Sequence, residues 1–503
     1  MQDNHFYVTT PIYYVNDKPH IGHAYTTILA DVLTRYHRTQ GQKSFFLTGV
    51  DEHGQKVQQA AEKRGLEPQL HADEMAPRFK TLWQRLEIQY DDFIRTTEDR
   101  HKRIVQLALQ KVFDNGDVYA DKYEGWYSVA EERFITETEM QSGQFRDVKK
   151  LKEKNYFFRM SKYQNRLIDH VENNPGFIQP ESRRNEILGF LRQPLGDLCI
   201  SRPKSRLSWG IELPFDKDYV TYVWFDALMN YISAMGWGSD EARFREWWPV
   251  TVQLIGKDIL MTHAIYWPTM LFSLGVELPR MIFAHGWWLT GDTKMSKSLG
   301  NIVDPLGLVD EYGVDAVRYY LMREMVLGMD SNFSVESFVK RYNSDLANDF
   351  GNLLNRVSGL IGKYFGGTVP QPAQRLVEDE QIQDFASRTL PEKIPDLIGQ
   401  MRIHDAIEQT MALVRNVNTY IERQAPWKVV KTDLARTGTI LYTATEALRI
   451  AAVFLSPVMP EKTRQVLDVL GDDRADILWG GLKPGVQLKA HEPLFPRIET
   501  EKT

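Results

Sequence analysis

The stretch His5–Leu33, HFYVTTPIYYVNDKPHIGHAYTTILADVL, decides the fold class of this chain. Residues 5–10 are mostly aromatic and β-branched, which predicts a buried strand that ends in a turn led by Pro11. After Gly22 the apolar residues recur at helical spacing, and they are Ile28, Leu29, Val32, Leu33 and Tyr36. The stretch therefore predicts a strand, a loop and an amphipathic helix that ends at Gly41.

This strand–loop–helix unit recurs along the chain. Residues 44–48 predict a second strand that runs into the loop 49–54, and two later strands are predicted at 252–255 and 281–284. Such alternation implies a parallel sheet covered by helices. Ligands of open parallel sheets bind beyond the carboxyl ends of the strands, and polar or glycine residues follow each of these strands.

Two other regions have different patterns. Between about 118 and 218 short β-like pieces rich in Tyr, Trp, Lys and Glu predict an insertion that splits the α/β domain. Its basic run 146–154 is interpreted as a solvated hairpin rather than an RNA contact. From about 342 onward strand signals nearly vanish, and apolar stripes at 346–361, 403–421 and 441–455 predict a helical bundle.

Composition narrows the function classes. The 503 residues include 43% hydrophobic and 25% charged residues, which is typical of a globular protein. The net charge of −6 argues against a wholly basic nucleic-acid binder. A local basic patch could still contact RNA. We expect no signal peptide at the N-terminus and no membrane-spanning stretch. The single Cys199 excludes a disulfide within the chain and favours a cytoplasmic protein.

The segment His20-Ile21-Gly22-His23 places two imidazoles three residues apart at a predicted helix start. A helix N-terminus favours anions and lowers nearby imidazole pKa values, so neutral N–H groups could donate to a phosphate. Gly22 leaves room for a flat base or ribose. The alternative for an isolated pair is two ordinary surface histidines.

The segment Lys294-Met295-Ser296-Lys297-Ser298 brings two ammonium groups together on a loop between Gly291 and Gly300. Mobile point charges of this kind can stabilise the transition state for attack on an α-phosphoryl group. A solvated basic loop is the alternative. The two segments in this order predict adenylate-forming chemistry.

Two aromatic-rich segments, 222–231 and 259–267, suggest the second substrate. Such stripes are commonly plain core. Aromatic rings also suit a thioether, because sulfur is polarisable and packs well near ring edges. His263 could donate weakly to such a sulfur, or it could be a satisfied core histidine.

Seven segments together resemble the bacterial methionyl-tRNA synthetases, a family of class I aminoacyl-tRNA synthetases. They are Pro11–Tyr14, His20–His23, Asp51–Gly54, Tyr222–Ala227, Lys294–Ser298, Gly351–Arg356 and Ala425–Trp427. The likeness covers nearly the whole chain. It implies ATP-dependent activation of L-methionine, with Mg²⁺ on the phosphates, followed by transfer to tRNA(Met), including the initiator tRNA.

The resemblance also implies three sets of binding residues. The methionine site would comprise Pro11, Ile12, Tyr14, Asp51, Trp224, Ala227, Leu228, Tyr231, Ile259, His263 and Trp267, with Asp51 pairing with the ammonium group. ATP would contact His20, Gly22, His23, Gly256, Asp258, Lys294, Ser296 and Lys297, of which the histidines and lysines are the expected catalytic residues. The anticodon readers would be Asn352, Arg356 and Trp427. A helical wheel places Asn352 and Arg356 as neighbours that point away from the apolar stripe.

This chain departs from the family pattern in two ways. Zinc-bearing members carry Cys-x-x-Cys after the tyrosine that corresponds to Tyr127, whereas Ser128 and Glu131 stand here. We therefore expect no structural zinc and a metal-free knuckle held by packing. Many relatives also append a dimerisation domain, so a chain that ends at Thr503 is expected to be a monomer.

The expected architecture is a Rossmann-like parallel sheet split by a connective insertion and followed by an α-helical anticodon-binding bundle. The expected bounds are 1–117 and 219–285 for the catalytic halves, 118–218 for the insertion, 286–341 for the region of the lysine motif and 342–503 for the bundle. Two rival hypotheses remain. The chain could be another class I synthetase, or a tRNA-binding regulatory module with a decayed active site.

Overall fold

The computed structural model describes residues 5–16, 18–128, 133–135, 137–141, 147–291, 293–294, 303–472 and 476–499. The chain divides into two compact units. Unit 1 comprises residues 1–19, 37–84 and 89–285, and unit 2 comprises residues 20–36, 85–88 and 286–503.

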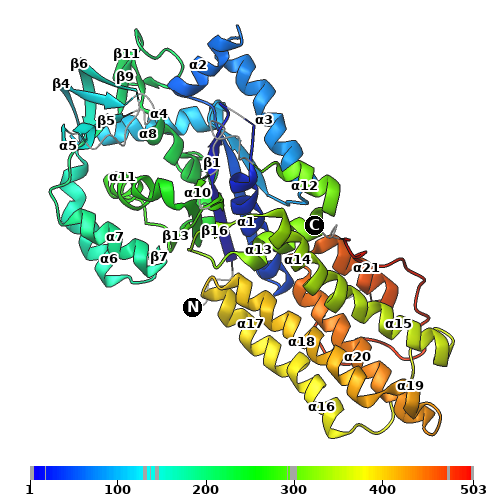
Figure 1. The fold of residues 1–503 in the computed structure, drawn as a ribbon. Coiled ribbons are helices and arrows are strands. Elements are labelled where there is room, and N and C mark those ends of the chain that lie inside the picture. Colours follow the sequence, from blue (N-terminus) through cyan, green and yellow to red (C-terminus); the bar gives the residue numbers. More distant parts are fainter. Residues whose placement is uncertain are drawn as a thin grey trace. The chain divides into compact units, whose positions relative to one another are not determined.

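A six-stranded parallel sheet forms the centre of unit 1 (Figure 1). The strand order is β3-β2-β1-β12-β13-β7. The strands are β1 His5–Tyr14, β2 Lys43–Asp51, β3 Asp92–Arg95, β7 Ile178–Gln179, β12 Val252–Gly256 and β13 Ile282–His285. Most residues of β1 and β2 are buried, as expected for strands covered on both faces. The predicted parallel α/β core is confirmed.

The predicted turn at Pro11 is wrong, because β1 continues through it to Tyr14. The pairing of β1 with β2 shifts register between Thr9 and Ile12. Proline has no N–H to donate to a sheet, so an irregularity of this kind lets the strand pass through Pro11. The longer strand carries Ile12 and Tyr14 to the carboxyl edge of the sheet.

Helices connect and flank these strands. Those of unit 1 outside residues 118–218 are α2 Gln55–Lys63, α3 Pro68–Arg85, α4 Asp99–Asp114, α8 Val223–Leu228, α9 Asn230–Ser233, α10 Glu241–Trp247, the 3₁₀ turn Lys257–Ile259, the π-helical turn Thr262–Tyr266 and α11 Trp267–Leu274. Side chains from α4, α9 and α11 share one apolar core with the sheet.

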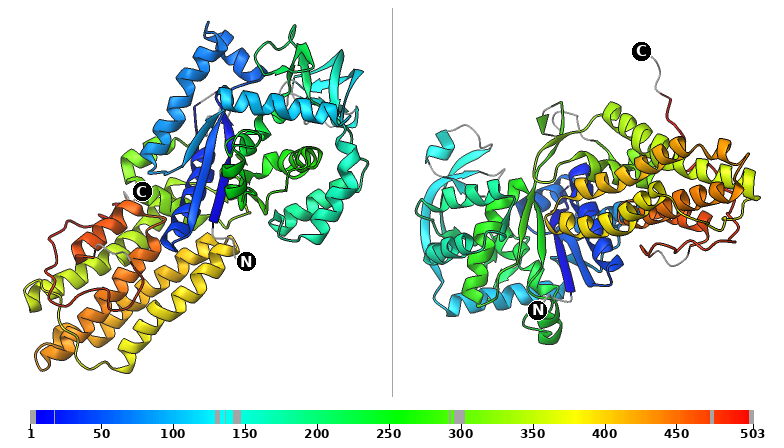
Figure 2. Two further views of the ribbon diagram at one scale, coloured as in Figure 1. Left: turned by 180° about the vertical axis from the view of Figure 1, so that it is seen from behind. Right: turned by 90° about the horizontal axis from the view of Figure 1, so that it is seen from below.

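Residues 118–218 form two small antiparallel sheets and helices (Figure 2). Their elements are β4 Val118–Ser128, β5 Arg133–Ile135, α5 Glu137–Gln141, β6 Val148–Phe158, the 3₁₀ turn Met160–Tyr163, α6 Gln164–Asn173, α7 Glu181–Leu191, β8 Leu198–Cys199, β9 Ser201–Pro203, β10 Glu212–Leu213 and β11 Asp216–Thr221. The basic run lies largely on β6, which pairs with β4 from Val118↔Phe158 to Ser128↔Val148.

The range 118–218 does not stand wholly apart from the parallel sheet. Strand β7 pairs with β13 as the edge of that sheet, and Leu167 and Ile187 of α6 and α7 belong to its apolar core. A strand of two residues is too short to show a periodic pattern, so the sequence does not reveal that residues 118–218 contribute a strand to the parallel sheet.

Unit 2 is mainly helical, and the helices α15, α16, α17, α18, α20 and α21, coloured from yellow-green to red, run side by side (Figures 1 and 2). Its helices are residues 21–36 of α1 Ile21–Thr39, α12 Pro305–Tyr312, α13 Val314–Glu324, α14 Val335–Arg341, the π-helical segment Tyr342–Gly351, α15 Asn352–Phe365, α16 Val377–Asp384, the π-helical segment Phe385–Thr389, α17 Leu390–Gly399, α18 Ile403–Gln424, α19 Pro426–Val429, α20 Leu434–Leu455 and α21 Pro460–Leu470. Its strands are β14 Trp288–Thr290, β15 Thr293–Lys294 and β16 Ser331–Asn332. The predicted bundle is confirmed, since the described residues from 342 onward contain no strand element.

Helix α20 is the one described helix that is long and apolar enough to cross a membrane. In the structure 94% of its apolar window is buried inside the protein. Such burial is typical of the central helix of a bundle.

Candidate active site

The strand order of unit 1 reverses between β1 and β12, from which the sheet grows in both directions. The carboxyl edge next to such a reversal is the usual ligand-binding position in open parallel sheets. Tyr14 ends β1 beside Asp51 at the end of β2, and Gly256 ends β12 beside His285 at the end of β13. The topology therefore brings the residues expected after separate strands to one edge.

Aromatic side chains from α8, α9 and the helical segments after β12 form a cluster of tilted and edge-on contacts. Tyr231 lies between His263 and Trp267, with ring centroids 5.8 Å from each, and Trp224 meets His263 edge-on at 6.4 Å. His263 belongs to a π-helical turn, a rare geometry that often occurs at functional sites. Tyr231 and Trp267 are fully buried, whereas Trp224, Ile12 and Ile259 are half-buried against the same core.

The remaining residues expected at the methionine site also lie in unit 1. Pro11, Asp51, Ala227 and Leu228 are buried, and Tyr14 is half-buried. Asp51 is only 3% exposed. A buried carboxylate at a strand end suits a ligand that carries a positive charge.

Both ring nitrogens of His263 are hydrogen-bonded. Its Nδ1–H donates to the carbonyl oxygen of Ile259 at 3.0 Å, so Nε2 accepts from the Tyr231 hydroxyl at 2.8 Å. Burial lowers the pKa of His263 to about 4, which keeps the ring neutral near pH 7. The expectation that His263 donates to a thioether therefore gives way to its alternative, a satisfied histidine that orients Tyr231.

This protonation state predicts a pH dependence of stability. Because the pKa of His263 is lower in the folded protein than the ordinary value near 6.5, the folded state loses stability as the pH falls from about 6.5 to about 4. We expect thermal unfolding of the wild type to move to lower temperature between pH 7 and pH 5. His263→Gln should show a smaller change over this interval, and an identical change in both proteins would contradict the prediction.

Gly256 lies close to the side chain of Asp258 at the end of β12. A Cβ atom there would lie 2.6 Å from Asp258 Oδ1 and 3.9 Å from His285 Cε1. Asp258 itself is exposed. The absence of a side chain at Gly256 leaves the carboxylate of Asp258 where it can meet a polar ligand.

In unit 2, His20 and His23 lie at the N-terminus of α1. Their rings are 3.9 Å apart, and the backbone N–H of Gly22 donates to His20 Nδ1 at 3.1 Å. Burial lowers the pKa of His23 well below its ordinary value, and the neighbouring His20 lowers it further. The first turn of α1 contains no acidic residue. The neutral imidazole of His23 at a helix N-terminus suits an anion site.

The lysine motif is only partly described. Lys294 lies on β15, where its backbone pairs with Leu289 of β14. Met295, Ser296, Lys297 and Ser298 lie outside the described residues.

Sequence reasoning missed a buried polar cluster beside the aromatic rings. The carboxylate of Asp226 contacts His53 Nδ1 and His101 Nε2, each at 2.7 Å. Burial opposes ionisation of Asp226, but the two imidazoles bring its pKa down to about 2. His53 and Asp226 stand within the segments Asp51–Gly54 and Tyr222–Ala227, whereas nothing in the sequence marks His101.

The expected anticodon residues lie in unit 2. Asn352 and Arg356 lie on α15, and Trp427 lies on the short helix α19; all three are half-buried. Arg356 donates to Glu422 at 2.7 Å and to Asn418 at 3.3 Å. The expected outward orientation is thus met only in part, because a wheel of one helix omits the neighbouring α18.

The knuckle has cation–π contacts near the position where zinc-bearing relatives carry cysteines. The guanidinium groups of Arg202 and Arg206 lie 5.3 and 4.7 Å from the ring centre of Tyr127. Arg206 also pairs with Glu153 at 3.2 Å. Ser128 is buried, and Glu131 lies outside the described residues. Among the described residues, no three His, Cys, Asp or Glu side chains are grouped so as to hold a metal ion.

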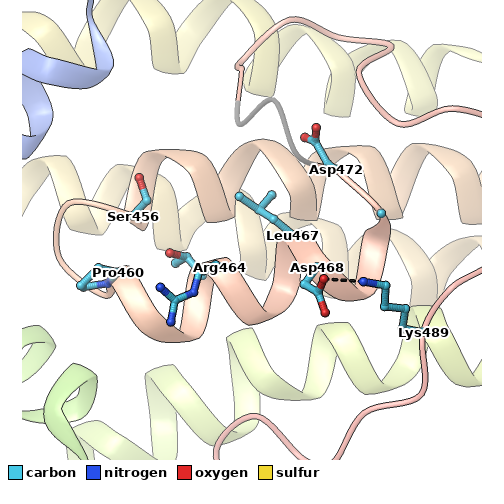
Figure 3. A pocket seen from close by; sticks show the side chains of 9 residues that line it. Ser456, Pro460, Arg464, Leu467, Asp468, Asp472 and Lys489 are labelled. Atoms are coloured by element: carbon cyan, nitrogen blue, oxygen red, sulfur yellow. Dashed lines mark hydrogen bonds and ion pairs between the residues drawn. The ribbon is translucent and has the colours of Figure 1, made fainter.

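A separate cavity of about 510 Å³ lies along α21 in unit 2 (Figure 3). Ser456, Arg464, Asp468 and Lys489 line it, and Asp468 pairs with Lys489 at 2.5 Å. No residue expected at a binding site lines this cavity.

Comparison with known protein families gives two matches. Residues 6–144 and 141–358 match the family of tRNA synthetases class I (M). Residues 369–503 match the anticodon binding domain of methionyl tRNA ligase.

Individual relatives agree with these matches. A methionine–tRNA ligase of Clostridium acetobutylicum is 46% identical over 99% of this chain and 79% of its own length, and that of Caldanaerobacter subterraneus is 44% identical over the same shares. A solved structure described as Mycobacterium tuberculosis methionyl-tRNA synthetase in complex with methionyl-adenylate is 40% identical. It superposes with a TM-score of 0.94 over 98% of this chain and 100% of that chain.

Proposed function

This chain belongs to the bacterial methionyl-tRNA synthetases, and from that premise we propose how its residues attach methionine to tRNA at the expense of ATP. The observation that carries the assignment of roles is the aromatic cluster around His263, in the same unit as the buried Asp51. Together they offer an apolar, polarisable surface for a thioether and a negative charge for an ammonium group.

Methionine binding uses residues of unit 1. The carboxylate of Asp51 pairs with the substrate ammonium group. Tyr231, held by His263, and Trp224 contact the thioether chain, and the other apolar members of the proposed site are Pro11, Ile12, Tyr14, Ala227, Leu228, Ile259 and Trp267. Because His263 is neutral, it adds no charge beside the sulfur.

Adenylate formation is a displacement at phosphorus. A carboxylate oxygen of methionine attacks the α-phosphorus of ATP, and the bond from that phosphorus to the bridging oxygen breaks to release pyrophosphate. We propose that N–H groups of His20 and His23 and the ammonium groups of Lys294 and Lys297 stabilise the charge that develops on the phosphates. Gly22, Gly256, Asp258 and Ser296 complete the proposed ATP contacts.

Mg²⁺ fits this chemistry as a partner of the nucleotide rather than of the protein. It commonly binds through substrate phosphates and water, and it neutralises phosphate charge when bound. We assign no protein ligand to it, because the described residues contain no group of acidic side chains arranged for a metal.

Transfer completes the cycle. The 2′-hydroxyl of the terminal adenosine of tRNA attacks the carbonyl carbon of the adenylate, an ester forms and AMP leaves with the bonding electron pair. No side chain need become covalently modified, so catalysis rests on positioning and charge stabilisation. The proposed substrates are the initiator and elongator forms of tRNA(Met).

The proposed anticodon contacts predict a selective kinetic effect. In the structure Arg356 pairs with Glu422, and this ion pair can orient the guanidinium group toward a base edge. Trp427 can stack on an unpaired base. We expect Arg356→Ala to raise the KM for tRNA about tenfold or more while methionine-dependent pyrophosphate exchange without tRNA stays unchanged. Arg388→Ala, at a more exposed ion pair with Asp384, is the matched control. Loss of pyrophosphate exchange in the Arg356 variant would contradict the assignment.

The knuckle residues do not fit zinc. Ser128 replaces a thiolate, and Arg202 and Arg206 bring positive charge to the face of Tyr127 where a cation would be repelled. We expect the purified enzyme to contain no stoichiometric zinc and to keep its activity after EDTA treatment and return to excess Mg²⁺. Elemental analysis checks this, and one zinc per chain would overturn it.

The assignment as a whole is tested by pyrophosphate exchange with single amino acids. Methionine should support exchange, whereas leucine, isoleucine, valine and cysteine should not. Exchange with one of those four would identify another class I synthetase, and a chain that binds tRNA without any exchange would be a regulatory module. We further propose a monomeric, cytoplasmic enzyme, which sedimentation and cell fractionation can test.

A further inference from the structure

The buried cluster of Asp226, His53 and His101 takes no part in the mechanism proposed above. All three residues are at most 4% exposed. They come from three segments of unit 1: His53 follows β2, His101 lies in the first turn of α4, and Asp226 lies on α8. Behind His101, the hydroxyl of Ser233 on α9 lies 2.9 Å from Nδ1.

The cluster joins segments that carry opposite ends of the proposed methionine site. Asp51, proposed for the ammonium group, is two residues before His53. Trp224 and Ala227, proposed for the side chain, flank Asp226 on α8. One carboxylate therefore ties the loop after β2 to the helix that bears the aromatic surface.

Other bonds of the loop after β2 join it to segments other than α8. The indole N–H of Trp209 donates to the Glu52 carbonyl at 2.5 Å, and Arg95 pairs with the Glu52 carboxylate at 2.7 Å. These bonds hold the loop to β3 and to the insertion, not to α8. The hydrogen bond from His53 to Asp226 links this loop to α8.

We propose that Asp226 is a positioning residue for methionine, whose carboxylate, clamped between His53 and His101, sets the distance between Asp51 and the Trp224–Ala227 surface. This inference rests on the proposed methionine site. A carboxylate accepts from both imidazole N–H groups at once, and such charge-assisted bonds are short and directional. An amide offers an acceptor on one side and a donor on the other, so one imidazole must change tautomer or separate.

The test is Asp226→Asn in the full-length enzyme, with methionine affinity measured by calorimetry and both KM values by pyrophosphate exchange. We expect the Kd and KM for methionine to rise about tenfold, with the KM for ATP within about twofold of wild type. The matched control is Asp117→Asn, which removes another buried carboxylate of unit 1, one that accepts from Lys162, Tyr163 and Ser273. Asp117→Asn should lower thermal stability without changing the Kd for methionine.

If Asp226→Asn does not fold, a less disruptive variant can test the same positioning role. Ser233→Ala removes only the group behind His101, and it should weaken methionine binding in the same direction by a smaller factor. Methionine affinity equal to wild type in the folded variants, or an equal rise after Asp117→Asn, would overturn the inference.

Trp224→Ala separates this inference from the proposed site. If Trp224→Ala leaves methionine binding unchanged, the proposed site itself is wrong. If Trp224→Ala weakens binding and Asp226→Asn does not, the site stands and the positioning role fails.

Discussion

Replacing Asp51 by asparagine is expected to raise the KM for methionine about a hundredfold or more, with little change in the KM for ATP. The carboxylate is 3% exposed at the end of β2, so a neutral amide leaves the ammonium group of bound methionine without its counter-charge in a nearly dry site. Asparagine conserves the shape of the side chain, so packing is not the cause. Pyrophosphate exchange with methionine and ATP varied in turn measures both constants.

Asp258→Asn is the matched control for this experiment. Asp258 is exposed beside Gly256 and is proposed to meet ATP, so its amide variant should change the KM for ATP rather than that for methionine. If Asp51→Asn raised both KM values equally, the ammonium-binding role would be wrong.

Replacing Arg449 by methionine is expected to destabilise the helical bundle by about 3–5 kcal/mol, the usual cost of breaking a buried ion pair. Arg449 and Glu446 of α20 are fully buried and pair at 2.8 Å. Arg449 also donates to the carbonyl oxygens of Asp476 and Leu478, and Glu446 accepts from the N–H groups of Gly480, Gly481 and Leu482. The variant leaves a buried carboxylate and loosens the segment 476–482.

Hydrogen exchange is the suitable measurement, because a chain with two compact units need not unfold in one step. Amides of α20 and of 480–482 should exchange faster in Arg449→Met. Lys489→Met breaks the ion pair with Asp468 beside the cavity of Figure 3, where both side chains are about 60% exposed, and it should cost less than about 1 kcal/mol. Equal effects of the two variants would contradict the buried role.

Local patterns in the sequence were enough for the main elements. The helical spacing of Ile28, Leu29, Val32, Leu33 and Tyr36 corresponds to buried positions of α1, and the stripe of Ile403, Ile407, Val414, Val417 and Ile421 is buried on α18. Periodicity works here because a helix or strand that buries one face must repeat its apolar residues at its own period. Pro11 misled the prediction, because the irregular register that tolerates it depends on the partner strand β2.

Motif residues were equally accessible. Short sequence segments with recognisable chemistry were enough to single out His20, His23, Asp51 and Trp224. The hydrogen-bond partners of these and other site residues could not be predicted from the sequence. His263 was considered as a donor to sulfur, but the structure shows both its ring nitrogens bonded within unit 1. Arg356 was expected to point outward, but α18 supplies Glu422 as its partner.

The sequence by itself thus determined the parallel α/β core, the helical bundle and the family, and it marked the two segments proposed to bind phosphate. Only the tertiary structure decided which buried polar groups meet. His53 and His101 reach Asp226 across 173 and 125 residues of chain. Periodicity and motifs depend on residues that are close in the sequence. The partner of a buried charge depends instead on which distant segments the folded chain brings together. Such a partner is needed because burying a charge without one costs too much free energy.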